Sequence, residues 1–313
     1  MIIDRARNRA RIVTLILLAT LNYCIAAVIA ATMTGVVIVI WILAHADGLP
    51  DSLDELKWIG IGAGAIVAVS AVIGGVIAVV RIPTLRRGLE AQVIRDTGAT
   101  IAVPDTLPRV RNLLDGLAIA AGIPAPRFCV IDDPALNSFG VGTKPESTII
   151  GITTGLIDTL SRDELEAILA YEITRVASWD VAMASWTAAL TGRALTAVAA
   201  DETAIFGAPS RWMTLRLQAW ALRGQGLERD AAAMAVSRNP ASLVHALERL
   251  AADPAVVASM TTATAPLWIE VPDSLVVGTG SDGSPRHTVA LGSLLLSERI
   301  TALRELAHLP PST

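Results

Sequence analysis

The stretch LAYEITRVASWD, residues 169–180, contains residues whose types and spacing could do chemistry. In the pattern H-E-x-x-H, two histidines four residues apart lie on one helix face and hold a zinc ion, while the glutamate acts as general base. Here Tyr171 and Arg175 stand at the histidine positions, and Glu172 stands at the position of the base. The central question is whether this helix performs that chemistry or keeps only its framework.

Signals around this stretch predict the elements that position it. A capping box formed by Ser161 and Glu164 predicts that its helix begins at Arg162. Apolar residues recur at helical spacing over 105–121, and Gly122 with Pro124 ends that earlier helix.

Two short strands are expected between the helices, RFCVIDD at 127–133 and STIIGIT at 147–153, with NSFGVG at 137–142 as a turn-rich loop. These elements predict a mainly α fold with a small β-sheet, an α+β class.

Two uncharged stretches, residues 12–44 and 58–80, are each long enough to cross a bilayer, which takes about 20 apolar residues. Arginines precede the first and follow the second, and the loop between them is acidic. The positive-inside rule then places both ends in the cytoplasm. We expect residues 1–85 to form a transmembrane hairpin of a multi-pass protein of the inner (plasma) membrane, with residues 86–313 as its cytoplasmic main domain.

Residues 181–223 could also associate with the membrane. For residues 181–200, interrupted by Arg193, we favour a buried or surface-lying helix over a third span. Residues 211–223 carry three arginines among tryptophans and leucines, a pattern typical of an amphipathic helix at a membrane or partner surface.

Composition excludes several classes of protein. The 313 residues are 53% hydrophobic with a mean hydropathy of +0.56, which is high for an ordinary soluble domain. A net charge of −4 and the lack of a dense basic patch exclude nucleic acid as a partner. The two cysteines lie far apart and in different environments, Cys24 in an apolar stretch and Cys129 in an expected strand, so they indicate neither a disulfide framework nor a cysteine metal site.

Several segments, in order, resemble the M48 family of membrane zinc peptidases, the HtpX-like group. They are AGIPAPRFCVIDDPALNSFGVG, STIIGITTGLIDTLSRDELEAILAYE, LERDAAAMAVSRNPASLVHALERL and SERITALREL, and they fall within about 86–306. The resemblance implies a zincin-like domain behind the twin spans, with zinc as the cofactor of the family. It also places the first histidine at Tyr171, the base at Glu172 and the second histidine at Arg175. The third ligand falls on Gly226, four residues before Asp230.

None of the three residues at the ligand positions is a good zinc ligand. Tyrosine ionises only near pH 10, arginine is a permanent cation, and glycine has no side chain. We therefore expect no metal and no other cofactor, with Glu172 as a relic base and Asp180 and Asp230 as supporting residues. Arg175 is expected to act as a single structural cation that pairs with Glu172 or with Asp230.

The resemblance also implies a peptide groove beside an edge strand, here Thr148–Thr153, lined by Asn137, Phe139, Ile150 and Ile152. An edge strand can bind a peptide by strand addition without any catalysis. A segment of a partner or this chain's own Gly278–Pro285 could occupy the groove, and neighbouring helices filling it is the alternative.

We interpret the chain as a catalytically inactive pseudopeptidase that serves as a membrane-bound binding or scaffold subunit, with a membrane protein or complex and the lipid bilayer as partners. The alternative is an M48-type membrane metalloendopeptidase with a non-standard metal site, acting in membrane protein quality control. The sequence names neither a partner nor a substrate.

Overall fold

The structure of the chain is a computed structural model. It describes residues 5–45, 53–103, 106–200, 220–221, 227–261, 264–271, 277–279, 285–287 and 296–310.

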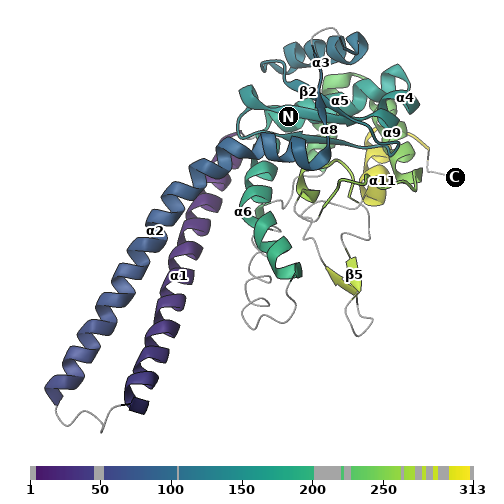
Figure 1. The fold of residues 1–313 in the computed structure, drawn as a ribbon. Coiled ribbons are helices and arrows are strands. Elements are labelled where there is room, and N and C mark those ends of the chain that lie inside the picture. Colours follow the sequence, from purple (N-terminus) through teal and green to yellow (C-terminus); the bar gives the residue numbers. More distant parts are fainter. Residues whose placement is uncertain are drawn as a thin grey trace. The chain divides into compact units, whose positions relative to one another are not determined.

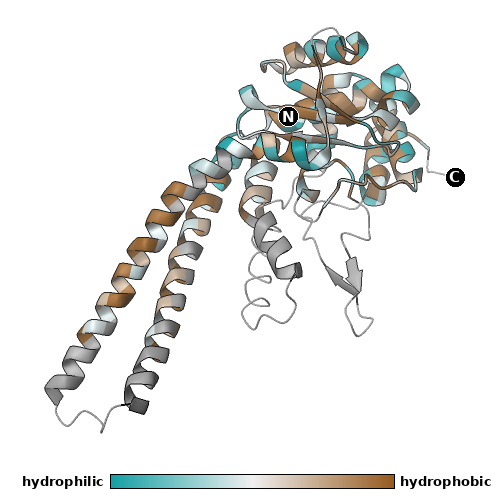
Figure 2. Cartoon of the chain, viewed as in Figure 1, coloured by the Kyte–Doolittle hydropathy of each residue, from teal (hydrophilic) through white to brown (hydrophobic). Residues whose placement is uncertain are grey.

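The chain divides into two compact units, Val13–Arg87 and Met1–Ile12 together with Gly88–Thr313. The first unit consists of parts of two long helices, α1 (Arg5–His45) and α2 (Leu53–Thr97). These helices cover the two stretches expected to span the membrane, and their coloured parts in Figure 2 are largely apolar. Among the residues with a described placement, no helix meets the length and apolarity needed to cross a membrane. The transmembrane hairpin therefore stays a prediction.

The second unit contains a mixed four-stranded sheet with the strand order β1-β2-β4-β3. Its strands are β1 (Thr100–Ile101), β2 (Arg127–Ile131), β3 (Ser138–Val141) and β4 (Ile149–Thr153). β2 runs parallel to β4, while β3 runs antiparallel to it, with Phe139 opposite Gly151. The expected strands at 127–133 and 147–153 are confirmed as β2 and β4.

Two predictions about the sheet are wrong. NSFGVG is not a loop, because four of its residues form β3. Thr148–Thr153 is not an edge strand, because β4 lies between β2 and β3, and all five of its residues are buried. Strand order depends on pairings between distant segments, which the local pattern of one strand does not reveal.

Besides α5 (Arg162–Ala177), the helices of the second unit are α3 (Pro108–Ala121), α4 (Thr154–Thr159), α6 (Asp180–Ala200), α8 (Leu227–Ser237), α9 (Pro240–Ala252) and α11 (Leu296–Leu306). Helix α5 contacts α3, α6, α8 and α9, while α11 contacts α8 and α9, and α4 contacts β4; Figure 1 labels these helices. Short 3-10 turns lie at Pro145–Ser147 and Ala265–Leu267, and β5 (Val277–Thr279) pairs with β6 (Pro285–His287) in a separate sheet. The fold is therefore mainly helical with a small mixed sheet, as expected.

Two apolar cores lie in this unit. One contains residues of α3, α5, α9 and α11 together with Phe128, Ile150 and Ile152. The other contains Cys129, Phe139 and Ile149 with residues of α6. Alternate residues of β4 thus enter different cores, as the two-residue period of a strand requires. The sheet is covered on both faces, and residues 181–189 of α6 are buried. Whether residues 181–200 lie in the protein or cross the membrane stays a prediction, because the side chains of 191–200 lie outside the described residues.

Candidate functional site

Helix α5 presents the three residues of the Y-E-x-x-R pattern. Its start is fixed by the expected capping box, in which the Ser161 hydroxyl accepts from Glu164 N at 3.3 Å and Glu164 Oε2 accepts from Ser161 N at 2.8 Å. Such a cap contributes about 0.5–2 kcal/mol. From residue 167 to its end at Ala177 the helix is buried on all sides. Tyr171, Glu172 and Arg175 therefore lie in the interior of the unit.

Glu172 and Arg175 form a buried ion pair. Arg175 Nη1 lies 3.1 Å from Glu172 Oε1 and 2.9 Å from Oε2, and the Ser138 hydroxyl donates to Oε1 at 2.9 Å. Glu172 is 0% and Arg175 1% exposed. The sequence predicted that Arg175 pairs with Glu172 or with Asp230, and the pair with Glu172 is the one that forms.

The pKa of Arg175 is raised above its ordinary value. Burial by itself lowers the pKa, but attraction to Glu172, and then to Tyr171 and Asp180, outweighs it. Arg175 is consequently a fixed positive charge inside the protein.

Asp230 is paired with a different arginine, Arg299 on α11. Arg299 Nε lies 2.9 Å from Asp230 Oδ2, and Nη2 lies 2.7 Å from Oδ1, which is the bidentate geometry of a strong ion pair. Of the two carboxylates considered for Arg175, Glu172 is thus the one it pairs with, and Asp230 has a cation of its own.

Sequence reasoning missed Arg299 as a site residue. Burial lowers its pKa, but Tyr171 and Asp230 more than offset this effect and raise the pKa well above the ordinary value. The only signal available was its position in SERITALREL, a segment noted for its resemblance and not for its charge.

Tyr171 lies beside both cations. The guanidinium carbon of Arg299 is 5.0 Å, and that of Arg175 5.8 Å, from the centroid of the Tyr171 ring. Both distances lie within the range of cation–π attraction. The ring that stands in the first histidine position therefore packs against two positive charges, an arrangement that repels a metal ion.

Asp180 connects the end of α5 to other elements. It accepts from Asn8 Nδ2 at 2.8 Å and from the Ser178 hydroxyl, and its Oδ2 lies 2.9 Å from Arg229 Nε. Asn8 Nδ2 also donates to Ser178 O at 2.8 Å. Through these contacts Asp180, the first residue of α6, joins α1, α8 and the C-cap of α5.

The residues that the structure describes at this site do not suit zinc. Arg175 fills the place of a ligand with a buried cation, and Glu172 already accepts hydrogen bonds on both oxygens. Within the described part of the chain, no three histidine, cysteine, aspartate or glutamate side chains gather in a way that could hold a metal ion. Gly226, the third expected ligand position, lies outside the described residues.

The predicted groove residues are buried and do not line an open groove. Ile150 and Ile152 are 0% exposed and belong to the helical core, because β4 is an interior strand. Phe139 is also 0% exposed, and its ring lies over Gly151, where an added Cβ would come within 2.0 Å of the ring. Asn137 is 4% exposed.

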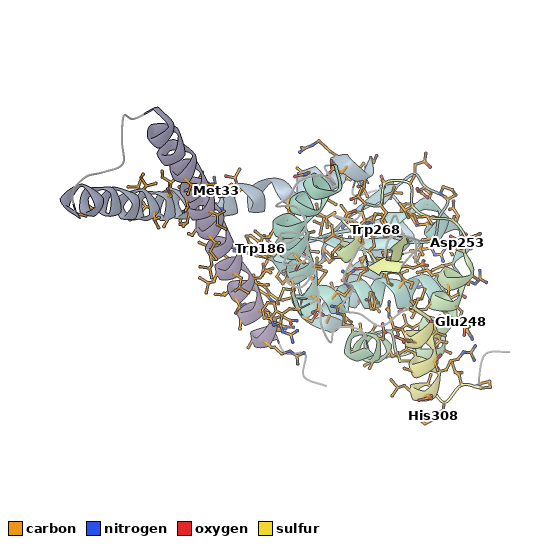
Figure 3. All side chains as sticks on the ribbon, turned by 90° about the horizontal axis from the view of Figure 1, so that it is seen from below. Met33, Trp186, Glu248, Asp253, Trp268 and His308 are labelled. Atoms are coloured by element: carbon orange, nitrogen blue, oxygen red, sulfur yellow. The ribbon has the colours of Figure 1, made fainter. Side chains whose placement is uncertain are left out.

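The outer side of β3 is covered by the protein itself, through a bridge between Phe139 and Trp268. Trp268 is 5% exposed and lies among the packed side chains in Figure 3. The residue that forms this bridge, Trp268, lies outside the predicted occupant Gly278–Pro285. The two described ends of that occupant pair with each other in the sheet of β5 and β6, with Thr279 opposite Pro285 and Gly278 opposite Arg286, and residues 280–284 lie outside the described residues.

Comparisons with known proteins agree with the resemblance. A model of peptidase family M48 matches residues 104–293. The chain is 31% identical to a Protease HtpX homolog of Dictyoglomus thermophilum over 202 residues, which cover 58% of this chain and 66% of that protein. It is 29% identical to a Protease HtpX homolog of Limosilactobacillus fermentum over 195 residues, 54% of this chain and 64% of that protein.

The match thus spans less than two thirds of the length of these relatives. Among solved structures, the crystal structure of S. mikatae Ste24p is similar with a TM-score of 0.38 and 16% identity, over 90% of this chain and 75% of that chain. The family model covers more than half of the chain. The chain therefore belongs to peptidase family M48.

Proposed function

We propose that this protein is a catalytically inactive member of its family that serves as a membrane-bound binding or scaffold subunit. The observation that carries the proposal is the buried pair of Arg175 with Glu172. A general base must reach the proton that it abstracts. Both oxygens of Glu172 are instead engaged by Arg175, and one also by Ser138.

The replacement of residues also conserves charge. A zinc ion with one carboxylate ligand carries one net positive charge, which is the charge of a single arginine. In this chain Gly226 stands at the position of the carboxylate ligand and Arg175 at that of a histidine. The guanidinium of Arg175 balances Glu172 without a metal, which supports a site that keeps its fold after losing its chemistry.

Membrane attachment is part of the proposal. The uncharged stretches 12–44 and 58–80 are long enough to span a bilayer, and the arginines that flank them favour a cytoplasmic main domain at the inner (plasma) membrane. Relatives are named as proteases, so the ancestral surface acted on proteins. An inactive member would retain protein recognition, and we propose a membrane protein or complex as its partner.

A peptidase assay tests the inactivity. The full-length chain, purified in detergent with zinc added, is incubated with an unfolded protein such as casein, and the Glu172→Gln variant serves as the matched control. We expect both proteins to give the same background cleavage. Cleavage by the unmodified chain that Glu172→Gln and a chelator both abolish would instead support the metalloendopeptidase alternative.

A further inference from the structure

Residues 267–270, called here the covering segment, lie along the outer edge of β3. Ile269 N donates to Ser138 O at 2.9 Å, next to the bridge between Phe139 and Trp268. The rings of Phe139 and Trp268 lie 5.0 Å apart between centroids and are tilted by 53°. The segment therefore makes the backbone and side-chain contacts that an added strand would make.

Both site arginines also bind this segment. Arg175 Nη1 donates to Leu267 O at 3.0 Å, and Arg299 Nη1 donates to Ile269 O at 3.2 Å. Hydrogen bonds from charged donors are stronger than those between neutral groups. Each guanidinium is at the same time fixed by its carboxylate, so the two ion pairs hold the segment at Leu267 and at Ile269.

Asn137 also connects the segment to β3. Ser138 N donates to Asn137 Oδ1 at 2.9 Å, which engages a main-chain donor of β3 in a local side-chain bond. Ile269 O, two residues beyond Leu267 O, accepts from Arg299. Asn137 Nδ2 also donates to Glu270 O at 3.0 Å and so binds the end of the segment.

We propose that the covering segment is an internal pseudo-ligand, locked onto the β3 edge by Arg175 and Arg299. An extended peptide can then pair with β3 only after the segment has left, which requires the arginine hydrogen bonds to Leu267 O and Ile269 O to break. Strand addition needs free backbone groups on β3, and the segment already uses Ser138 O. This inference rests on the proposed function and names what fills the inactive site. Held by Arg175 and Arg299, the segment would occupy the β3 edge at all times unless a partner displaces it.

The test combines hydrogen exchange with binding of a probe, a fluorescent peptide with the sequence APLWIEVP of residues 265–272. In full-length Trp268→Ala, which loses the ring contact, we expect exchange at 265–271 to become at least roughly tenfold faster, because local opening becomes easier. The affinity for the probe should rise by at least roughly tenfold as the edge becomes free. Trp268→Phe keeps a ring and should behave like the unmodified chain.

A second variant tests the arginine lock directly. Arg299→Lys keeps the charge beside Asp230 but loses the planar fork that reaches Ile269 O, so it should also speed exchange at 265–271. Exchange of the buried α5 amides, unchanged in each variant, would show that the unit remains folded. If Trp268→Ala does not fold, Arg299→Lys alone decides.

The inference is overturned if the unmodified chain binds the probe as tightly as the variants do. It is equally overturned if exchange at 265–271 stays at the original rate in every folded variant. Neither readout depends on zinc or on cleavage. A failure of the lock is therefore distinguishable from a failure of the proposed inactivity, which the peptidase assay measures.

Discussion

Arg175 holds both carboxylate oxygens of Glu172 from a single nitrogen, at 3.1 and 2.9 Å, in the interior of the protein. Pairs at this spacing on an exposed helix surface contribute only about 0.2–0.5 kcal/mol. Here both side chains are nearly inaccessible to solvent, with exposures of 2% and 0%. Because each charge depends on the other for compensation, the pair has a structural role that an exposed pair could not have.

Replacing Arg175 by alanine should therefore destabilise the domain strongly. We expect Arg175→Ala to lower the free energy of unfolding by about 3–5 kcal/mol, because Glu172 is left as an uncompensated buried charge. Arg127→Ala is the matched control, since Arg127 is 56% exposed and lies 3.8 Å from Glu90, and it should cost less than about 1 kcal/mol. Denaturant titration in detergent measures both values, and equal losses in the two variants would contradict this account.

The second ion pair should show strong coupling. Arg299→Leu or Asp230→Leu alone should cost about 3–5 kcal/mol, whereas the double variant should cost less than the sum of the two. A double-mutant cycle on unfolding free energies should give a coupling of about 0.5–3 kcal/mol, as found for residues in direct contact. Strictly additive losses would show that the two residues do not stabilise one another.

The capping glutamate should make stability depend on pH in the acidic range. Burial raises the pKa of Glu164, but hydrogen bonds with Ser161 and the charges of Arg249 and His245 lower it overall. A lowered native pKa contributes stability above the unfolded value of about 4.3, and this contribution is lost as pH falls through the native pKa.

The unfolding free energy of the unmodified chain should therefore exceed that of Glu164→Gln at neutral pH. The difference should shrink as pH falls below about 4. Arg249→Gln removes one group that lowers the pKa, at 3.1 Å from Glu164, and should weaken the same trend. A difference that stays constant with pH would argue against the ionised cap.

The predicted topology places both termini in the cytoplasm and residues 47–57 outside. A cysteine introduced at Asp51 should react with a membrane-impermeant thiol reagent in intact cells, whereas one at Ser161 should react only after lysis. Cys129 should not add background, because it is buried and burial raises its pKa to about 12, so little reactive thiolate forms. Labelling at Ser161 but not at Asp51 would reverse the orientation.

The sequence revealed features that depend on local spacing. The capping box at Ser161 and the contact of Arg175 with Glu172 follow from residues three positions apart on one helix. Gly122 ends α3 with a φ of 65°, a left-handed conformation that glycine adopts without strain.

Features that depend on distant pairings were not predictable in this way. Arg299 and Asp230 are separated by 69 positions. The covering segment meets β3 through Phe139 and Trp268, and helices α4 to α9 lie between these two residues in the sequence. The sequence of β3 resembled a loop because it contains Gly140. Glycine is needed there because an added Cβ would lie 2.8 Å from Val181 and 3.2 Å from Glu172. Packing, and not strand propensity, decides the residue at that position.

The metal content of the purified full-length chain tests the central claim most directly. Protein prepared without chelators, in medium containing zinc, is analysed by elemental mass spectrometry beside its Glu172→Gln and Asp230→Asn variants. The account predicts zinc far below one ion per chain in all three, because Arg175 occupies a ligand position with a buried charge. Near-stoichiometric zinc in the unmodified chain that is lost in either variant would contradict it.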